Sequence, residues 1–322
     1  MPIENSPVFI IGSYRSGTSV LTWCLGQHPN ILPLPETHWI ARLSVDMKLL
    51  FQLGTINARF SHFGALEWTE KDFYAAFGKT INQFVVDTRE PRLRFIRSLA
   101  RKKHGLSEER IKKMESSGKL SPDPELVTAK NYQVVRSSSD PKLRWVDGTP
   151  ENTHYIYGLS MMFPEAKFIH ILRNPNDVAR SLMCFSNVGG AGKDYTEVQA
   201  YGAWRRLVEQ AVKGEKALGS EKILRINYED LVSHPDTTLQ NCFCFLGEEF
   251  SEESMLPLKE KINSSATTSR LEGTKFPSVK EGVEANKYYQ SIINSKLGEP
   301  ELKSMEELAI AFQSVANRVN VR

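Results

Sequence analysis

Residues 9–21 read FIIGSYRSGTSVL, and four residues separate Gly12 from Gly17, which is the spacing of a phosphate-binding loop. In nucleotide kinases and hydrolases, a lysine after the second glycine reaches the β- and γ-phosphates, and the next Ser or Thr binds magnesium. Thr18 stands in that lysine position here. The stretch therefore predicts a phosphate-binding loop that neutralises its anion without the usual lysine.

The residues on either side of this loop predict a strand before it and a helix after it. Residues 8–11 form a short β-branched and aromatic run between Pro7 and Gly12, as in a buried strand. After the loop, apolar residues recur at helical spacing until Gly26. This order would direct the backbone N–H groups of the helix N-terminus, and its partial positive charge, at one bound anion.

A second unit of the same kind reads AKFIHILRNPNDVARSLMCF, residues 166–185. Its apolar run predicts a strand that ends at Arg173. Asn174 is a suitable N-cap, and Pro175 fits the first position of a helix. Ser181 then falls on that helix, so the pattern predicts an arginine and a serine near the carboxyl end of a second strand.

A third strand is predicted at residues 223–227, followed by YEDLVSHP and a helix that ends near Leu246. Strands that alternate with helices indicate an α/β fold with a parallel sheet, whose ligands bind at the carboxyl ends of the strands. We predict one domain. Its parts are a core of about residues 5–50 and 133–250, a helical cap insertion of about 51–132, and a C-terminal lid and helix of about 251–322.

Composition indicates a globular protein and limits its partners. Of the 322 residues, 40% are hydrophobic and 25% are charged, and the formal net charge is +3. This charge is too small to favour a nucleic-acid partner. A basic stretch, residues 89–113, is more typical of a solvated helix face than of an anion site, although it could attract an anionic substrate.

The remaining composition signals concern location and cysteine chemistry. The N-terminus lacks a signal-peptide pattern, and no run approaches the roughly 18 apolar residues of a membrane span, so we expect a cytoplasmic protein. The cysteines lack CxxC spacing and stand among apolar neighbours, which predicts buried free thiols and no metal site. They are Cys24, Cys184, Cys242 and Cys244.

The motifs RSGT and RNPNDVARS resemble those of the P-loop sulfotransferases that use 3′-phosphoadenosine 5′-phosphosulfate (PAPS). The resemblance points to the branch with an Arg-Ser-Gly-Thr loop, which includes tyrosyl-protein sulfotransferases and bacterial members. It implies a P-loop-containing parallel sheet flanked by helices, and a 5′-phosphosulfate bound without a metal ion. Arg15 would then replace the missing lysine. The nucleotide-binding residues implied in the loop are Arg15, Ser16, Gly17, Thr18, Ser19 and Val20.

The same resemblance implies a site for the 3′-phosphate in the second motif. Arg173 and Ser181 occupy the places of the arginine and serine that hold this phosphate in relatives. Tyr228 follows the third strand, where relatives place a tyrosine beside the adenine, and its ring would offer a stacking face. A salt-bridging arginine, an ordinary helix serine and a core tyrosine are the structural alternatives.

Transfer to a hydroxyl also needs a base that accepts the proton of the acceptor. Glu36, in HPNILPLPETHW, matches the catalytic glutamate of the tyrosyl-protein branch by its distance from the loop and by the following Thr37. His38 is the alternative, because the cytosolic small-molecule branch uses a histidine. Both could instead be loop structure, with Glu36 capping a helix that begins near Thr37.

One position departs from the family pattern. Many relatives carry a lysine that neutralises the sulfuryl oxygens in the segment that reads DGTPEN here, and this chain has Gly148. Two neighbours in that segment, Asp147 and Thr149, are candidates for the acceptor site. Residues 269–282, SRLEGTKFPSVKEG, are the candidate for a tail segment that closes over the nucleotide. A cation from the basic cap or from the tail, namely Arg270, Lys275 or Lys280, could replace the lysine; otherwise the chemistry would be weaker.

Together the motifs predict transfer of a sulfuryl group from PAPS to a hydroxyl acceptor, with release of adenosine 3′,5′-bisphosphate (PAP). One alternative is a P-loop kinase or nucleotide hydrolase, which would need magnesium and a cation near the γ-phosphate. Another is a PAPS-binding protein without catalytic activity, for which Gly148 is the hint. The acceptor stays open among peptides, carbohydrates, lipid head groups and small alcohols, a bacterial metabolite is the expectation, and the oligomeric state is not predicted.

Overall fold

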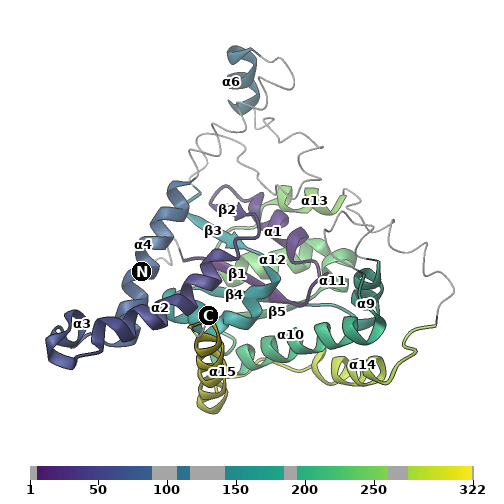
Figure 1. The fold of residues 1–322 in the computed structure, drawn as a ribbon. Helices are drawn as coiled ribbons and strands as arrows, with labels where there is room; N and C mark the ends of the chain where they lie inside the picture. The colour runs from purple at the N-terminus through teal and green to yellow at the C-terminus, as the bar shows by residue number, and fades with distance from the viewer. Residues whose placement is uncertain (1–5, 89–106, 117–141, 185–193, 260–274, 321–322) are drawn as a thin grey trace.

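Helices cover both faces of a five-stranded parallel sheet in this computed structural model, which describes residues 6–88, 107–116, 142–184, 194–259 and 275–320 (Figure 1). The strand order is β2-β3-β1-β4-β5. All neighbouring pairs are parallel. The strands are β1 (Val8–Gly12), β2 (Ile31–Leu34), β3 (Arg144–Asp147), β4 (Lys167–Leu172) and β5 (Ile223–Asn227).

The central strand β1 sets the position of the candidate site. From β1 the chain passes to the edge strand β2, returns to β3 beside β1, and then crosses to β4 and β5 on the other side. The loop after β1 therefore lies at the topological switch point of the sheet. Ligands of such sheets bind there, at the carboxyl ends of the strands.

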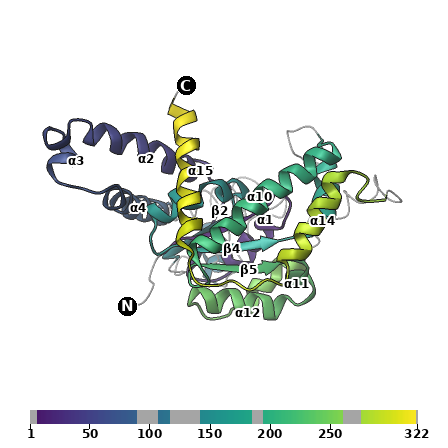
Figure 2. The same ribbon diagram turned by 90° about the horizontal axis from the view of Figure 1, so that it is seen from below.

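Alternate residues of the strands face two separate cores. Phe9 and Ile11 of β1 belong to one core, and Val8 and Ile10 belong to the other. Figure 2 shows α10 and α15 on one side of the sheet and α12 on the other. The first core packs under α2 (Trp39–Thr55), α4 (Glu70–Asp87), α8 (Ile156–Met162), α10 (Glu197–Leu218) and α15 (Leu302–Asn320). The second packs under α1 (Thr18–Gly26), α11 (Tyr228–Ser233), α12 (Pro235–Leu246), η4 (Glu252–Met255) and α13 (Leu256–Lys259).

A third buried cluster joins α9 (Pro175–Met183) and α14 (Lys280–Ile292) to α10. The side chain of Asn286 on α14 donates to Oδ1 of Asn176 on α9 at 2.8 Å. The hydroxyl of Tyr201 on α10 donates to the same oxygen at 2.7 Å. The start of α9 is thus held by two helices. The other described elements are η1 (Ala58–Phe60), α3 (His62–Ala65), α6 (Glu108–Ser116) and η2 (Pro150–Tyr155).

A buried network of charged side chains joins β4, β5, α10 and the end of α14. Nδ1 of His170 lies 2.7 Å from Oε1 of Glu215, and Arg225 donates to both oxygens of the same carboxylate. Nη1 of Arg225 also donates to the carbonyl of Ile292 at 2.6 Å. Burial alone would raise the pKa of Glu215, but its interactions with His170 and Arg225 outweigh burial and lower the pKa to about 2.

All four cysteines are free, and three are buried as predicted. Cys244 is exposed, so the prediction of burial was wrong for that residue. It lies two positions after the buried Cys242 on α12, and a step of two residues moves a side chain to the other side of a helix. Among the helices that the structure describes, none is long and apolar enough to cross a membrane.

The α/β class is confirmed, and the elements around both motifs form where the patterns predicted them: β1, α1, β4, α9 and β5. The final helix is also confirmed, with Leu302 as its first residue. Helices do follow the first unit, but α2 runs past the predicted start of the insertion at residue 51. The other domain boundaries stay predictions. The elements that were not predicted include β2, β3, α8, α10 and α14.

Candidate functional site

The loop after β1 has the geometry of an anion-binding loop. The N–H of Ser16 donates to the carbonyl of Ser13 at 3.3 Å, and the hydroxyls of the two residues lie 2.6 Å apart. Gly17, the N-cap of α1, has a φ of 97°, and no side chain among the described residues caps the helix. The first N–H groups of α1 therefore lack a side-chain acceptor and are available to an anion.

Tyr228 lies directly against this loop. A Cβ atom on Gly17 would come within 2.5 Å of the ring of Tyr228, so only glycine fits there, both for space and for its positive φ. The guanidinium of Arg173 lies over the same ring, 4.1 Å from its centroid. The ends of β4 and β5 thus meet at the loop after β1.

The two predicted motifs are in direct contact. Nε of Arg15 donates to the hydroxyl of Ser181 on α9 at 2.9 Å. Nη1 of Arg173 donates to the backbone carbonyl of Arg15 at 2.7 Å. The structure therefore brings together Arg15, Arg173, Ser181 and Tyr228, with Ser16, Gly17, Thr18, Ser19 and Val20 on the same loop and first helical turn.

Residues outside the motifs hold Arg173 in place. The indole N–H of Trp204 on α10 donates to the carbonyl of Arg173 at 3.0 Å, and the carboxylate of Glu229 accepts from the N–H of Asn174 at 3.0 Å. Nε of Arg173 is buried and has no hydrogen-bond partner among the described residues. An unpartnered buried donor is costly, and an anionic ligand would satisfy it. Sequence reasoning missed both supports because they are contacts between distant residues.

Glu36, Thr37 and His38 lie between β2 and α2, above a buried aspartate. Asp147 at the end of β3 accepts from the hydroxyl of Thr37 at 2.7 Å, and its other oxygen accepts from the N–H of Thr149 at 2.9 Å. The hydroxyl of Thr149 in turn accepts from the N–H of Thr37 at 2.9 Å. Asp147 and Thr149 are fully buried, so they support this loop and do not line an acceptor site, contrary to the sequence interpretation.

The side chains of the two candidate bases reach solvent. The side chain of Glu36 is 33% exposed and that of His38 is 57% exposed. Nε2 of His38 lies 3.6 Å from Oε2 of Glu36, and its Nδ1 lies 3.9 Å from Oε2 of Glu151. The N-cap of α2 is His38, so the alternative in which Glu36 caps this helix does not hold.

Two of the candidate residues have unusual backbone conformations. Arg15 has a φ of 62° and His38 a φ of 48°, both in the left-handed region that non-glycine residues seldom occupy. Such strained residues cluster at functional sites. Three other residues share this property, namely Ala58, Glu67 and Lys142, so it supports the assignment without deciding it.

Glu151 is a further acidic residue of this region. Burial raises the pKa of Tyr14 in the loop after β1, and Glu151 raises it further. Burial lowers the pKa of His154, with Glu151 acting in the opposite direction and Arg206 of α10 adding to the decrease. Glu151, on η2, therefore lies close to the loop after β1 and to His38. Its presence in DGTPEN was visible in the sequence, but no pattern gave it a role.

Close packing against α1 explains why position 148 is a glycine. A Cβ atom there would lie 2.0 Å from Oγ1 of Thr22 and 3.0 Å from the carbonyl oxygen of Thr18, both on α1. A lysine at this position would require α1 to move.

Three cations of the tail were predicted as substitutes for the missing lysine. Lys280 is 84% exposed and pairs with Glu284 at 3.5 Å, and Arg270 lies outside the described residues. Lys275 is exposed at the start of the described tail.

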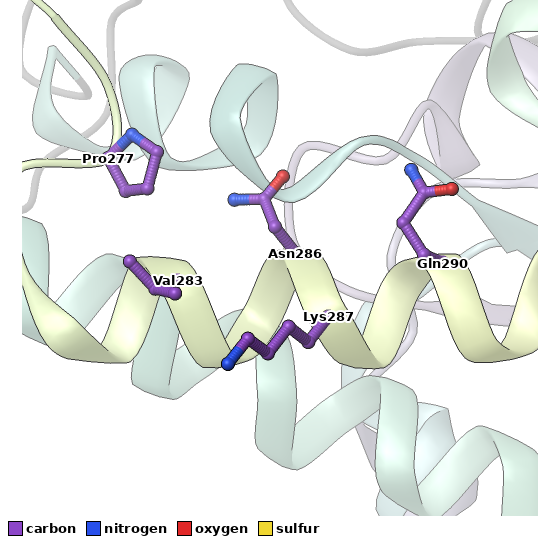
Figure 3. A pocket seen from close by; sticks show the side chains of 5 residues that line it. All are labelled: Pro277, Val283, Asn286, Lys287 and Gln290. Carbon is purple, nitrogen blue, oxygen red and sulfur yellow. The ribbon is translucent and has the colours of Figure 1, made fainter.

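A hollow of about 510 Å³ lies beside α14 (Figure 3). Its lining residues are Pro277, Val283, Asn286, Lys287 and Gln290. None of them was predicted as a ligand, although Pro277 belongs to the predicted tail segment. Residues 269–274 of that segment lie outside the described residues.

In the described part of the chain, no cluster of His, Cys, Asp or Glu suits a metal ion. The expectation that the nucleotide binds without a metal ion stays a prediction.

The chain is similar in sequence to a curated protein and in structure to solved domains. A curated protein of Aquifex aeolicus, described as uncharacterized, is 21% identical over 320 residues, which are 95% of this chain. The chain spans only 35% of the length of that relative. Two solved structures are similar over 96% of the chain. They are the sulfotransferase domain of the Synechococcus PCC 7002 olefin synthase (20% identity, 95% of that chain, TM-score 0.42) and the sulfotransferase domain of the curacin biosynthetic pathway (18%, 98%, 0.43).

The sequence profile described as the sulfotransferase family matches residues 7–252. This span contains all five strands, the loop after β1, the candidate nucleotide-binding residues and the two candidate bases. It leaves out α14 and α15. Because the match extends over well more than half of the chain, the protein belongs to the sulfotransferase family.

Proposed function

We propose that this protein transfers a sulfuryl group from PAPS to a hydroxyl acceptor and releases PAP, with Glu36 as the general base. The observation that carries the proposal is the contact between the two motifs, in which Arg15 reaches Ser181 and Arg173 reaches the backbone of Arg15. Two cationic side chains and an uncapped helix N-terminus meet at the carboxyl ends of three parallel strands. A nucleotide with phosphates at two ends requires this arrangement.

The residues present fit PAPS. The N–H groups of Thr18 to Val20 and the Arg15 side chain would hold the 5′-phosphosulfate. Arg173 and Ser181 would hold the 3′-phosphate, and the buried unpartnered Nε of Arg173 is a donor suited to it. The ring of Tyr228 would lie beside the adenine, between Gly17 and the Arg173 guanidinium.

When bound, PAPS supplies an activated sulfuryl group. The bond between sulfur and the bridging oxygen of the 5′-phosphate breaks, and a bond forms between sulfur and the acceptor oxygen. Arg15 and the N–H groups of α1 stabilise the negative charge that develops on the bridging oxygen, which they bind more strongly in the transition state. The proton of the acceptor hydroxyl passes to Glu36. A well-placed base of this kind typically contributes about 10²–10⁴-fold.

Two contacts in the structure are compatible with Glu36 as the base. Thr37, next to both residues, is fixed to the buried Asp147 and Thr149, so the position of the Glu36 backbone is determined by the sheet. His38 lies between Glu36 and Glu151, where it can orient both carboxylates. The Arg-Ser-Gly-Thr loop and the Glu36-Thr37 pair also support membership of the branch that includes tyrosyl-protein sulfotransferases.

A kinase or nucleotide hydrolase is the less favoured alternative. β3 does end in an aspartate, Asp147, which the sequence analysis did not predict and which a magnesium-dependent enzyme could use. Both of its oxygens, however, already accept hydrogen bonds from Thr37 and Thr149. Thr18 in the lysine position leaves no cation of the usual kind for a γ-phosphate.

A thermal-shift titration with PAP, set beside ATP with magnesium, tests the proposal. A ligand that binds only the folded state stabilises it by about 2.7 kcal/mol at a hundred times its Kd. We expect PAP to stabilise the protein without magnesium, and Arg173→Ala to remove the effect. Arg205→Ala is the matched control, because Arg205 is an arginine of α10 paired with Glu209 on its own helix. Stabilisation by ATP with magnesium and not by PAP would overturn the proposal.

A further inference from the structure

Exposed apolar side chains concentrate on the helical arm formed by α2, η1, α3 and α4. Of the seventeen large hydrophobic side chains that are exposed among the described residues, ten lie between Trp39 and Phe84. Figure 1 shows α2, α3 and α4 extending away from the sheet. Single exposed apolar residues are ordinary, but a concentration of them marks a surface that contacts another molecule.

Part of this surface forms an apolar strip, which the exposed ion pair of Arg42 and Asp46 interrupts on α2. Residues three, four or seven positions apart share one face of a helix, and both α2 and α4 carry apolar residues at such spacings. The rings of Trp39 and Phe84 meet edge to face with centroids 6.2 Å apart, which joins the two faces. The apolar strip consists of Trp39, Leu43 and Leu50 on α2 and Phe77, Ile81 and Phe84 on α4.

One end of the apolar strip adjoins the candidate base. Trp39 follows His38 directly, at the start of α2. On the other helix, Oδ1 of Asn82 accepts from the indole N–H of Trp145 on β3 at 2.7 Å, which fixes this part of α4 to the sheet two residues before Phe84. The Trp39–Phe84 pair is therefore held at the carboxyl edge of the sheet, where Glu36 lies.

We propose that the apolar strip binds the acceptor and that the acceptor is an amphiphilic alcohol. Its hydroxyl lies at Glu36 and its apolar chain lies along Trp39, Phe84 and the rest of the strip. This inference rests on the proposed sulfuryl transfer. The two charged residues on the exposed side of α2 within the strip, Arg42 and Asp46, pair with each other at 3.0 Å, so they present little net charge to a chain lying there.

The length and position of the strip favour this occupant over a second copy of the chain. From Trp39 to Leu50, α2 rises by about 16 Å at 1.5 Å per residue, close to the length of an extended dodecyl chain. A second protein molecule docked on the Trp39 end would also cover Glu36 and exclude any acceptor. An alkyl chain that carries the reacting hydroxyl would lie along the apolar strip and place its hydroxyl at Glu36.

Direct binding can be measured without turnover. Bromine quenches tryptophan fluorescence on contact, so 2-bromoundecanol, whose bromine lies beside the hydroxyl and hence near Trp39, should quench the protein. 2-Bromopropanol, which has the same two groups without the chain, should not. Trp39→Phe should remove most of the quenching. Trp68→Phe is the matched control, because Trp68 is an exposed tryptophan of the same arm that stacks on Phe63 outside the strip. Absence of quenching by bromoundecanol, or equal quenching in Trp39→Phe, would overturn the inference.

Turnover gives a second test. With PAPS as donor, kcat/KM for primary alcohols should rise by up to about fourfold for each added methylene from butanol to dodecanol. Trp39→Ala and Phe84→Ala should lower kcat/KM for dodecanol at least tenfold and leave the PAP thermal shift unchanged. Ile310→Ala, an exposed apolar residue of α15, should change neither. A flat dependence on chain length, or a preference for glucose over dodecanol, would contradict the inference.

The results separate failure of this inference from failure of the proposed function. If PAP gives no thermal shift, the sulfotransferase activity itself fails. If PAP binds but the protein neither binds bromoundecanol nor prefers longer alcohols, only the acceptor class is wrong. Sedimentation of the wild type as a dimer that Trp39→Ala converts to a monomer would make the strip a subunit interface, and strip-dependent binding to phosphatidylcholine vesicles would make it a membrane contact. Either result would overturn the inference.

Discussion

The two halves of the candidate site are built in different ways. The donor half is the part that we propose binds the sulfuryl donor PAPS. Its residues Arg15, Arg173, Ser181 and Tyr228 contact one another and the loop after β1. The acceptor half is the part that we propose binds the hydroxyl acceptor. Its residues Glu36 and His38 reach solvent from a loop that Asp147 holds through Thr37. The residues proposed to bind PAPS hold one another in place. The loop that carries Glu36 and His38 is instead held by Asp147, to which we assign no ligand.

This difference fits the tasks that we propose for the two halves. A nucleotide with two phosphate groups always presents the same charges, so side chains that support one another can be arranged for it in advance. An acceptor site must expose its base to the incoming hydroxyl, and its specificity depends on the surface around that base. The exposed faces of α2 and α4 supply such a surface, while the opposite faces of these helices pack on the first core.

The largest expected effect tests the exposed half. Glu36→Gln keeps the size of the side chain and removes its basicity, so we expect turnover to fall by about 10²–10⁴-fold. Binding of PAP should not change, since the residues proposed to bind it are those of the loop after β1 with Arg173, Ser181 and Tyr228, and not Glu36. Rates of PAP release with the best alcohol of the series, compared for Glu36→Gln and His38→Gln, measure this. A larger loss in His38→Gln would assign the base to the histidine.

The buried network beneath the donor half should give the next largest effect. Glu215→Gln leaves His170 and Arg225 without their carboxylate, and loss of one partner of a buried pair costs about 3–5 kcal/mol of unfolding free energy. Denaturant unfolding measures the loss. Glu209→Gln is the control, because its pair with Arg205 is exposed and is expected to contribute less than about 1 kcal/mol. Equal effects of the two changes would contradict the role of burial.

The pH dependence of the same network has a defined sign. The pKa of Glu215 is about 2 in the folded protein, below its ordinary value of 4.5. Its contribution to stability is therefore fully present above pH 4.5 and is lost as the pH falls from 4.5 toward 2. Wild-type unfolding free energy should fall more steeply in this window than that of Glu215→Gln. Parallel curves for the two proteins would contradict this assignment.

A smaller effect is expected at the boundary between the halves. Gly148→Ala places a methyl group against Thr22 and Thr18 of α1, and overpacking of this kind typically costs about 1–3 kcal/mol. Thr22→Ala removes the nearer atom, so the double variant should be more stable than the sum of the single changes predicts. Denaturant unfolding of all three variants provides the measurement. Additive effects would show that the close approach does not determine the glycine.

The smallest effect is expected on the exposed arm. Phe60 is 80% exposed, and Phe60→Ser should change the unfolding free energy by less than about 0.5 kcal/mol. Gly17→Ala on the donor side, by contrast, would meet the ring of Tyr228 and should lower stability or PAP affinity measurably. A strong destabilisation by Phe60→Ser would show that this exposed surface of the arm contributes to the stability of the fold, and the contrast between the two halves would be lost.

Several parts of the fold that depend on neighbouring residues were predicted correctly. The loop after β1 follows from its glycine spacing, and Asn174 caps α9 with its side chain as its position before Pro175 indicated. α10 could have been predicted as well, because Thr196 and Gln199 form a capping box at its start. β2 was hidden by Pro33, which argues against a strand but is tolerated here because β2 is an edge strand.

The sequence by itself therefore determined the strand–loop–helix units, the family and the identity of the candidate phosphate ligands. Backbone propensities, caps and short motifs act between residues close in the chain, which is why one sequence reveals them. Only the tertiary structure decided that Arg15 meets Ser181, 166 positions away, that Tyr228 closes on Gly17, and that Asp147 is a buried support. Such contacts depend on how the sheet brings distant strand ends together, and no local pattern encodes that arrangement.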